Sequence, residues 1–89
     1  MITSVLEITN KLGLHARAAS VFVKTATAFS SEIIVSNPMK EANGKSIMSI
    51  MLLQAACGTQ VTVAVDGDDE IEAMKAICDL IENRFGEAE

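Results

Sequence analysis

Four stretches of the chain have the hydrophobic and polar pattern of β-strands. Three of them are rich in β-branched residues, and in the last one three valines alternate with threonine and alanine. The remaining stretch is short and follows the turn residues Asn37-Pro38-Met39, which favours a hairpin. The predicted strands are Ser4 to Thr9, Glu32 to Asn37, Lys40 to Asn43 and Gln60 to Val65.

Three other stretches have apolar residues at the spacing of an amphipathic helix. The first two predicted helices are Ala16 to Ala28 and Ile47 to Leu53, and the third ends near Arg84. The apolar residues of the first are Ala19, Phe22, Val23, Ala26 and Phe29. The apolar stripe of the third consists of Ile71, Met74, Ile77, Cys78 and Ile81.

Polar residues at the predicted helix starts have the character of caps. Ser46 stands immediately before the second helix, where its hydroxyl can accept a hydrogen bond from a free backbone N–H. Asp69 and Glu72 have the spacing of a capping box at the start of the third helix, and Gly86 suits its C-terminal end.

The resulting order, β-α-β-β-α-β-α, is typical of an α+β domain. Short connections and the absence of an internal repeat or linker predict one domain over residues 1–89. We expect a mainly antiparallel sheet with the helices packed on one face, that is, an open-faced sandwich.

Apolar residues cover most of the circumference of the short helix Ile47 to Leu53. A small core cannot accept all of them, so some are expected to form an exposed patch. We predict that Ile47, Met48 and Met51 form it, and methionine is well suited to surfaces that bind several partners.

Composition and charge narrow the function classes. The chain is 49% hydrophobic with a net charge of −5, and this charge disfavours nucleic acid or an anionic membrane as a partner. No stretch is long and apolar enough to span a bilayer or has the character of a signal peptide, so the expected location is the cytoplasm. Cys57 and Cys78 have no metal-ligand spacing with the histidine, and we expect them to be reduced and buried.

The stretch Asn10 to Ala19 contains the candidate chemistry. Its histidine, His15, is the only one in the chain, lies between Gly13 and the first predicted helix, and precedes Arg17 by two residues. A phosphate on this imidazole would meet free N–H groups, the helix dipole and a guanidinium. The same pattern also fits a surface or helix-capping histidine beside a glycine turn, and spacing alone does not decide between the two.

Two motifs resemble a known family. Gly13-Leu14-His15-Ala16-Arg17, followed by Gly44-Lys45-Ser46-Ile47-Met48, is similar to HPr, the histidine-containing phosphocarrier family of the bacterial phosphotransferase system. The resemblance extends over nearly the whole chain in length, spacing and element order. It implies a four-stranded sheet with three helices on one side. The chain departs from the family at Ala18, where proline is usual.

The resemblance implies a covalent relay without turnover of its own. His15 would accept a phosphoryl group at Nδ1 from a phosphoenolpyruvate-dependent enzyme I and pass it to sugar-specific enzyme IIA domains, with Arg17 stabilising the phosphate. It further implies a possible regulatory phosphoserine at Ser46, made by an HPr serine kinase/phosphorylase. The expected protein is a monomer with no cofactor and no metal.

Two alternatives remain at this stage. The residues Asn10-Lys11-Leu12-Gly13 also resemble the nitrogen-related branch of the phosphotransferase system, whereas the Ser46 motif favours the sugar branch. The chain could also be a non-catalytic protein-interaction module in which His15 is only structural.

Overall fold

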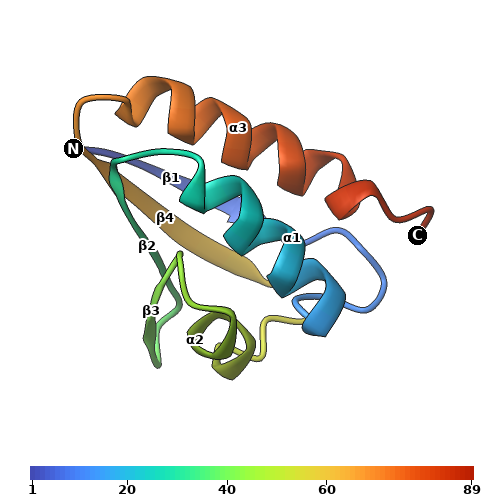
Figure 1. Ribbon diagram of the computed structural model, residues 1–89. Coiled ribbons are helices and arrows are strands. Elements are labelled where there is room, and N and C mark those ends of the chain that lie inside the picture. The colour runs from blue at the N-terminus through green and yellow to red at the C-terminus, as the bar shows by residue number, and fades with distance from the viewer.

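The computed structural model describes all residues from 1 to 89 and contains a sheet, three α-helices and one short 3₁₀ turn (Figure 1). The elements follow each other in the predicted order. Their bounds are β1 Ile2–Glu7, α1 Ala16–Thr27, β2 Glu32–Ser36, β3 Glu41–Asn43, α2 Ile47–Leu52, β4 Gln60–Asp66, α3 Glu70–Glu82 and the 3₁₀ turn η1 Arg84–Gly86.

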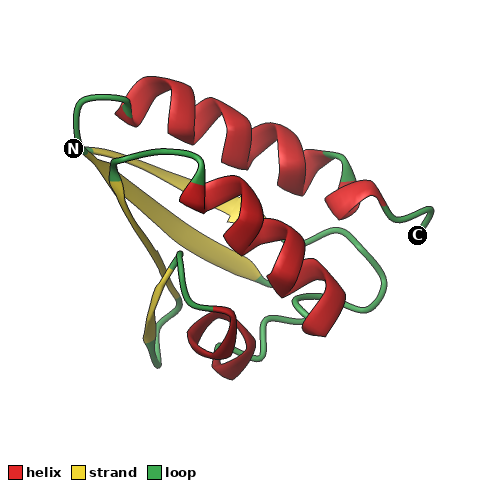
Figure 2. Cartoon of the chain, viewed as in Figure 1, coloured by secondary structure: helices red, strands yellow, loops and turns green.

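The strands form one antiparallel sheet in the order β1-β4-β2-β3. β4 lies in the middle and pairs with β1 from Ile2↔Val65 to Glu7↔Gln60. All three α-helices lie on the same side of the sheet, and the other side is left open (Figures 1 and 2). The predicted α+β open-faced sandwich is therefore confirmed.

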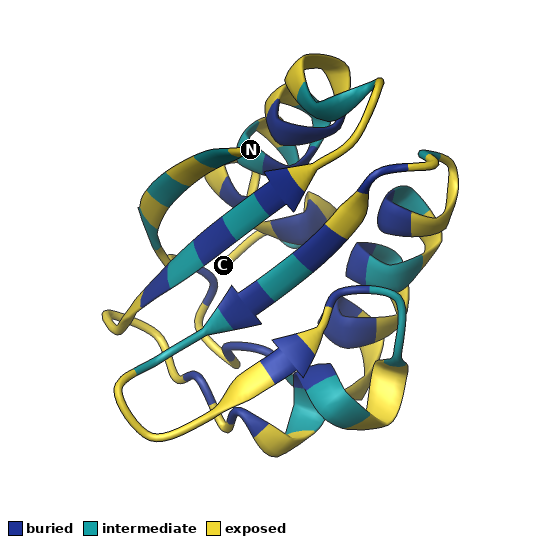
Figure 3. Ribbon diagram, turned by 90° about the vertical axis from the view of Figure 1, so that its left-hand side faces the viewer, coloured by how far each residue is buried: buried dark blue, intermediate teal, exposed yellow.

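The core lies between the sheet and the helices. On β4 the three valines are buried, while Thr62 and Ala64 between them point to the open face and are half-buried. Figure 3 shows this alternation along the strands. The helices contribute mainly small and aliphatic residues to the core, with Phe22 of α1 as the largest fully buried side chain. This two-residue period is what the sequence pattern of a half-buried strand predicts.

Several predicted boundaries differ from the observed ones. β1 begins and ends two residues earlier than expected, because pairing with β4 extends to Ile2 at its start. α3 ends at Glu82, and Gly86 closes the separate turn η1. The other predicted strands and helices agree within one residue at each end.

The burial prediction was wrong for both cysteines and for one apolar residue of α3. Cys57 is exposed in the connection before β4, and Cys78 is only half-buried. Ile71 is 71% exposed, because the buried side of α3 consists of Ala73, Met74, Ile77 and Ile81 and Ile71 lies outside it. Neither thiol is in a disulfide.

The predicted capping box at Asp69 and Glu72 is also wrong. The Asp69 carboxylate makes no cap hydrogen bond to its own helix. It accepts hydrogen bonds from the backbone N–H groups of Ser30 and Ser31, each at 2.9 Å, and from the Ser31 hydroxyl. Asp69 thus ties the start of α3 to the connection between α1 and β2.

No helix of the chain has the length and apolar character needed to cross a membrane.

Candidate functional site

The loop before α1 is held tightly against the connection that precedes β4. The Leu14 N–H donates to the carbonyl of Ala55 at 2.9 Å, and the Gly13 N–H donates to the carbonyl of Asn10 at 3.1 Å. Gly13 has a φ of +66°, and a Cβ here would contact the Ala55 carbonyl and lie 2.9 Å from Cα of Ala56. Glycine is therefore required both by conformation and by space.

His15 is the N-cap residue of α1. Its backbone is extended, with φ −75° and ψ −179°, and its side chain makes no cap hydrogen bond. The ring is free to turn away from the helix, and Nε2 lies 2.6 Å from Oε2 of Glu87. The simple helix-capping interpretation of His15 is wrong, because the ring is directed to a carboxylate 72 residues along the chain.

The C-terminal segment brings this carboxylate to the loop. The Lys11 N–H donates to the carbonyl of Glu89 at 2.9 Å, and Asn10 Nδ2 donates to Oε1 of Glu87 at 2.9 Å. Phe85 is buried and anchors the segment to the core. Figure 1 shows the C-terminus beside the loop that leads into α1. The pKa of Glu87 is lowered from its ordinary value, mainly by the hydrogen bond from Asn10 and next by the contact with His15.

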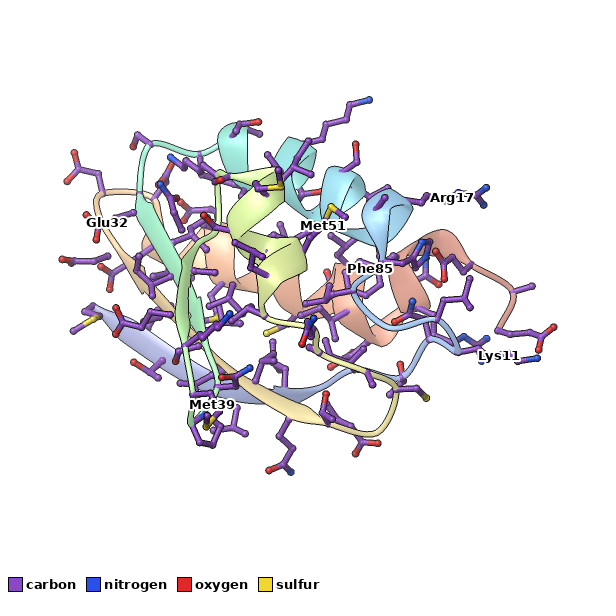
Figure 4. All side chains as sticks on the ribbon, turned by 90° about the horizontal axis from the view of Figure 1, so that it is seen from below. Lys11, Arg17, Glu32, Met39, Met51 and Phe85 are labelled. Carbon is purple, nitrogen blue, oxygen red and sulfur yellow. The ribbon has the colours of Figure 1, made fainter.

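His15, Arg17 and the C-terminal segment line one open pocket of about 850 Å³. Arg17 is exposed, and Figure 4 shows its side chain at the same end of the molecule as Lys11 and Phe85. The backbone N–H groups of Ala16, Arg17 and Ala18, in the first turn of α1, donate no hydrogen bond within the chain. An imidazole, a guanidinium and free N–H donors therefore lie together at a helix N-terminus, where an anion is favoured.

Comparison with known proteins identifies the family of the chain. Residues 2–83 match the family described as the PTS HPr component phosphorylation site. The chain belongs to the HPr family. The Phosphocarrier protein HPr of Neisseria meningitidis is 52% identical over 89 residues, with 100% of both chains covered.

Two solved HPr structures of Thermoanaerobacter tengcongensis are similar to this HPr-family chain throughout. HPr-C-His superposes with a TM-score of 0.95 at 52% identity, covering 100% of each chain. A structure described as an HPr dimer has a TM-score of 0.78 at 53% identity, covering 98% of this chain and 100% of that one.

Ala18, where the HPr family usually has proline, is the third residue of α1 and is fully buried. Its N–H has no acceptor within the chain, as expected in a first helical turn. Proline would lose no hydrogen bond here, and alanine is a good helix former. The departure at this position therefore leaves the start of α1 intact.

Ser46 lies at the start of α2, outside the His15 pocket. Its Oγ accepts a hydrogen bond from the Ser49 N–H at 3.3 Å, so the predicted N-cap is confirmed. Beside it, Ile47 and Met48 are 43% and 69% exposed, as predicted for the apolar patch.

Met51 was wrongly assigned to the exposed part of the patch. It is half-buried and packs against the core, whereas Leu52 is 55% exposed. The exposed patch of α2 consists of Ile47, Met48 and Leu52.

Residues distant in sequence were missed. Phe85 and Glu87 were not predicted as part of the site, and no local pattern marks them. Asn10 lay within the candidate stretch Asn10 to Ala19, but it was given no role there. In the sequence, Glu87 cannot be distinguished from any other solvent-exposed charged residue.

Proposed function

We propose that the chain is a phosphocarrier in which His15 accepts a phosphoryl group from a phosphoenolpyruvate-dependent enzyme I and passes it to enzyme IIA domains. The observation that carries this proposal is the position of the only histidine. It is directed into an open pocket with Arg17, at a helix start with free amides, in a chain of the HPr family.

The geometry supports a transient phosphoramidate. The resemblance assigns the bond to Nδ1, and of the two ring nitrogens only Nε2 has a hydrogen-bond partner. Arg17 and the first-turn amides can stabilise the phosphoryl oxygens. The partner proteins supply the other catalytic groups, so the chain has no turnover of its own and needs no cofactor or metal.

The exposed patch of α2 is the proposed contact surface for both partners. Ile47, Met48 and Leu52 offer adaptable apolar area near α1, with which α2 packs. Ser46 at the patch is the proposed regulatory phosphoserine. We further propose that the carrier acts as a monomer in the cytoplasm.

The test is incubation with phosphoenolpyruvate and enzyme I. The wild-type chain should gain about 80 Da, the mass of one phosphoryl group, and lose it in acid as expected for phosphohistidine. His15→Ala should fold normally and gain nothing, because the chain has no other imidazole. Acid-labile phosphate on His15→Ala would show that another residue is the acceptor.

The choice of enzyme I distinguishes the alternatives. Faster phosphorylation by enzyme I of the sugar branch than by that of the nitrogen branch supports the proposal, and the opposite order assigns the chain to nitrogen regulation. No phosphorylation by either would make the chain an interaction module.

A further inference from the structure

Glu87 connects the C-terminal segment to the reactive ring. Its Oε2 lies 2.6 Å from Nε2 of His15, and its Oε1 accepts from Asn10 Nδ2 at 2.9 Å. The side chain of Glu87 is 13% exposed, and Asn10 is fully buried. The proposed function assigns no role to either residue.

The backbone carbonyl of Gly13 determines which atoms donate and which accept among Asn10, Glu87 and His15. The carbonyl of Gly13 can only accept, so the Asn10 atom that lies 2.8 Å from it is the amide nitrogen. The same nitrogen gives its second hydrogen to Oε1 of Glu87. An ionised carboxylate accepts at both oxygens, so its contact with Nε2 requires a hydrogen on that nitrogen.

We propose that Glu87 is a positioning residue that holds the neutral His15 ring in the tautomer with its hydrogen on Nε2, leaving the lone pair on Nδ1. The inference rests on the proposed function of His15. Nδ1 makes no hydrogen bond in the chain, so the nitrogen that remains reactive is the unengaged one.

The arrangement also suits the charge changes of phosphoryl transfer. The Nδ1 lone pair forms the bond to phosphorus while the bond from phosphorus to the donor atom of enzyme I breaks, and that electron pair leaves with the donor atom. The hydrogen on Nε2 stays in place, so the phosphorylated ring becomes an imidazolium. Its positive charge then lies against the Glu87 carboxylate, and the reverse changes accompany transfer onward.

The C-terminal segment is built to keep Glu87 in this place. Arg84 and Phe85 have φ values of +55° and +56°, a costly conformation for side chains other than glycine. The turn directs Phe85 into the core and the following residues back over the loop, where Lys11 binds Glu89.

The first test needs no partner protein. Nitrogen-15 NMR shifts of His15 at about pH 9, well above the ordinary histidine pKa, report which ring nitrogen carries the hydrogen. Wild type should show a protonated Nε2 and an unprotonated Nδ1. Glu87→Gln should move both shifts toward a mixture of tautomers, because an amide places an acceptor at only one of the two positions that the carboxylate oxygens now occupy beside Asn10 and His15.

The second test measures phosphorylation by enzyme I. Where an aspartate orients the histidine of a serine protease, the amide variant costs about 10⁴-fold. The His15 side chain is 27% accessible, so solvent partly screens its contact with Glu87. We therefore expect a smaller loss, roughly tenfold, for Glu87→Gln and Glu87→Ala. The matched control is Glu82→Gln, which removes an exposed charge at the end of α3 from a side chain that makes no hydrogen bond or ion pair with His15.

The outcomes separate this inference from the proposed function. A wild-type ring with its hydrogen on Nδ1, unchanged shifts in both Glu87 variants, or equal effects of Glu87→Gln and Glu82→Gln would overturn the role of Glu87. A wild-type chain with the expected tautomer that enzyme I never phosphorylates would instead overturn the function proposed for His15.

Discussion

At the scale of single residues, the side chain of His15 is held by a contact within the chain, whereas that of Arg17 is not. The His15 ring is engaged at one nitrogen by Glu87, at 2.6 Å. Arg17 is exposed and is in no salt bridge within the chain. An exposed guanidinium acts through solvent-screened attraction, whereas the amides of the first turn of α1 are fixed donors.

Arg17→Ala should therefore slow phosphoryl transfer without abolishing it. We expect the rate of phosphorylation by enzyme I to fall about tenfold, which is about 1.4 kcal/mol of transition-state stabilisation, because the backbone donors remain. The measurement is the initial rate at low salt. An unchanged rate would remove Arg17 from the site. Lys24→Ala, on the exposed side of the same helix, is the control for a general loss of positive charge.

At the scale of elements, α2 combines a polar start with an apolar exposed side. Ser46 caps the helix through Ser49, and Ile47 and Met48 follow it on the surface. A phosphate on Ser46 would add about −1.5 to −2 charges at a helix start, where the dipole favours negative charge. The same phosphate would bring its hydration shell to the apolar patch.

Ser46→Asp is expected to separate stability from partner binding. It should melt at or above the wild-type temperature, since aspartate is also a good N-cap. Phosphorylation of His15 should be slower, mainly through a higher KM for enzyme I. Ser46→Ala distinguishes charge from loss of the cap, because it should lose about 1 kcal/mol of stability and keep the wild-type rate. A markedly destabilised Ser46→Asp, or one phosphorylated at the wild-type rate, would leave Ser46 as a cap only.

At the scale of the whole molecule, local patterns predicted the fold better than the site. Alternation at Val61, Val63 and Val65 reports burial on one face, and this pattern is independent of distant partners. The motif at Gly13 and His15 likewise marked the loop that contributes His15 to the pocket. Patterns of this kind contain no information on which polar atoms meet across the fold.

Two links of that kind escaped prediction. The contact from Glu87 to His15 spans 72 residues, and that from Asp69 to Ser31 spans 38. In the second case the local spacing was misleading. The Asp69 carboxylate has the position of a capping box, but it accepts hydrogen bonds from the connection between α1 and β2. The exposure of Ile47 and Met48 on α2 was predicted correctly, but that of Met51 was not. The local pattern does not fix how the helix is rotated on the core, and in the structure Leu52 is exposed where Met51 was expected to be.

Carboxylates that link distant segments give the molecule a characteristic response to acid. The Ser31 hydroxyl, followed by the Ser30 N–H, lowers the pKa of Asp69 to about 2. Gly67 and the N-terminal amine lower that of Glu70. A carboxyl with a lower pKa in the folded state stabilises the fold above its unfolded pKa, and this contribution is lost as the pH falls toward the folded value.

Asp69→Asn should therefore be less stable than wild type at neutral pH and approach it in acid. The stabilisation from Asp69 is present above its ordinary pKa of 3.8 and disappears as the pH falls toward about 2. Thermal melting between about pH 7 and pH 2 should show the two melting temperatures converging in that window. Asp68→Asn is the matched control, because it removes a neighbouring charge that is exposed and accepts no hydrogen bond from another segment. A constant difference between Asp69→Asn and wild type across the whole range would mean that the contact to Ser31 stabilises the fold by packing and not through its charge.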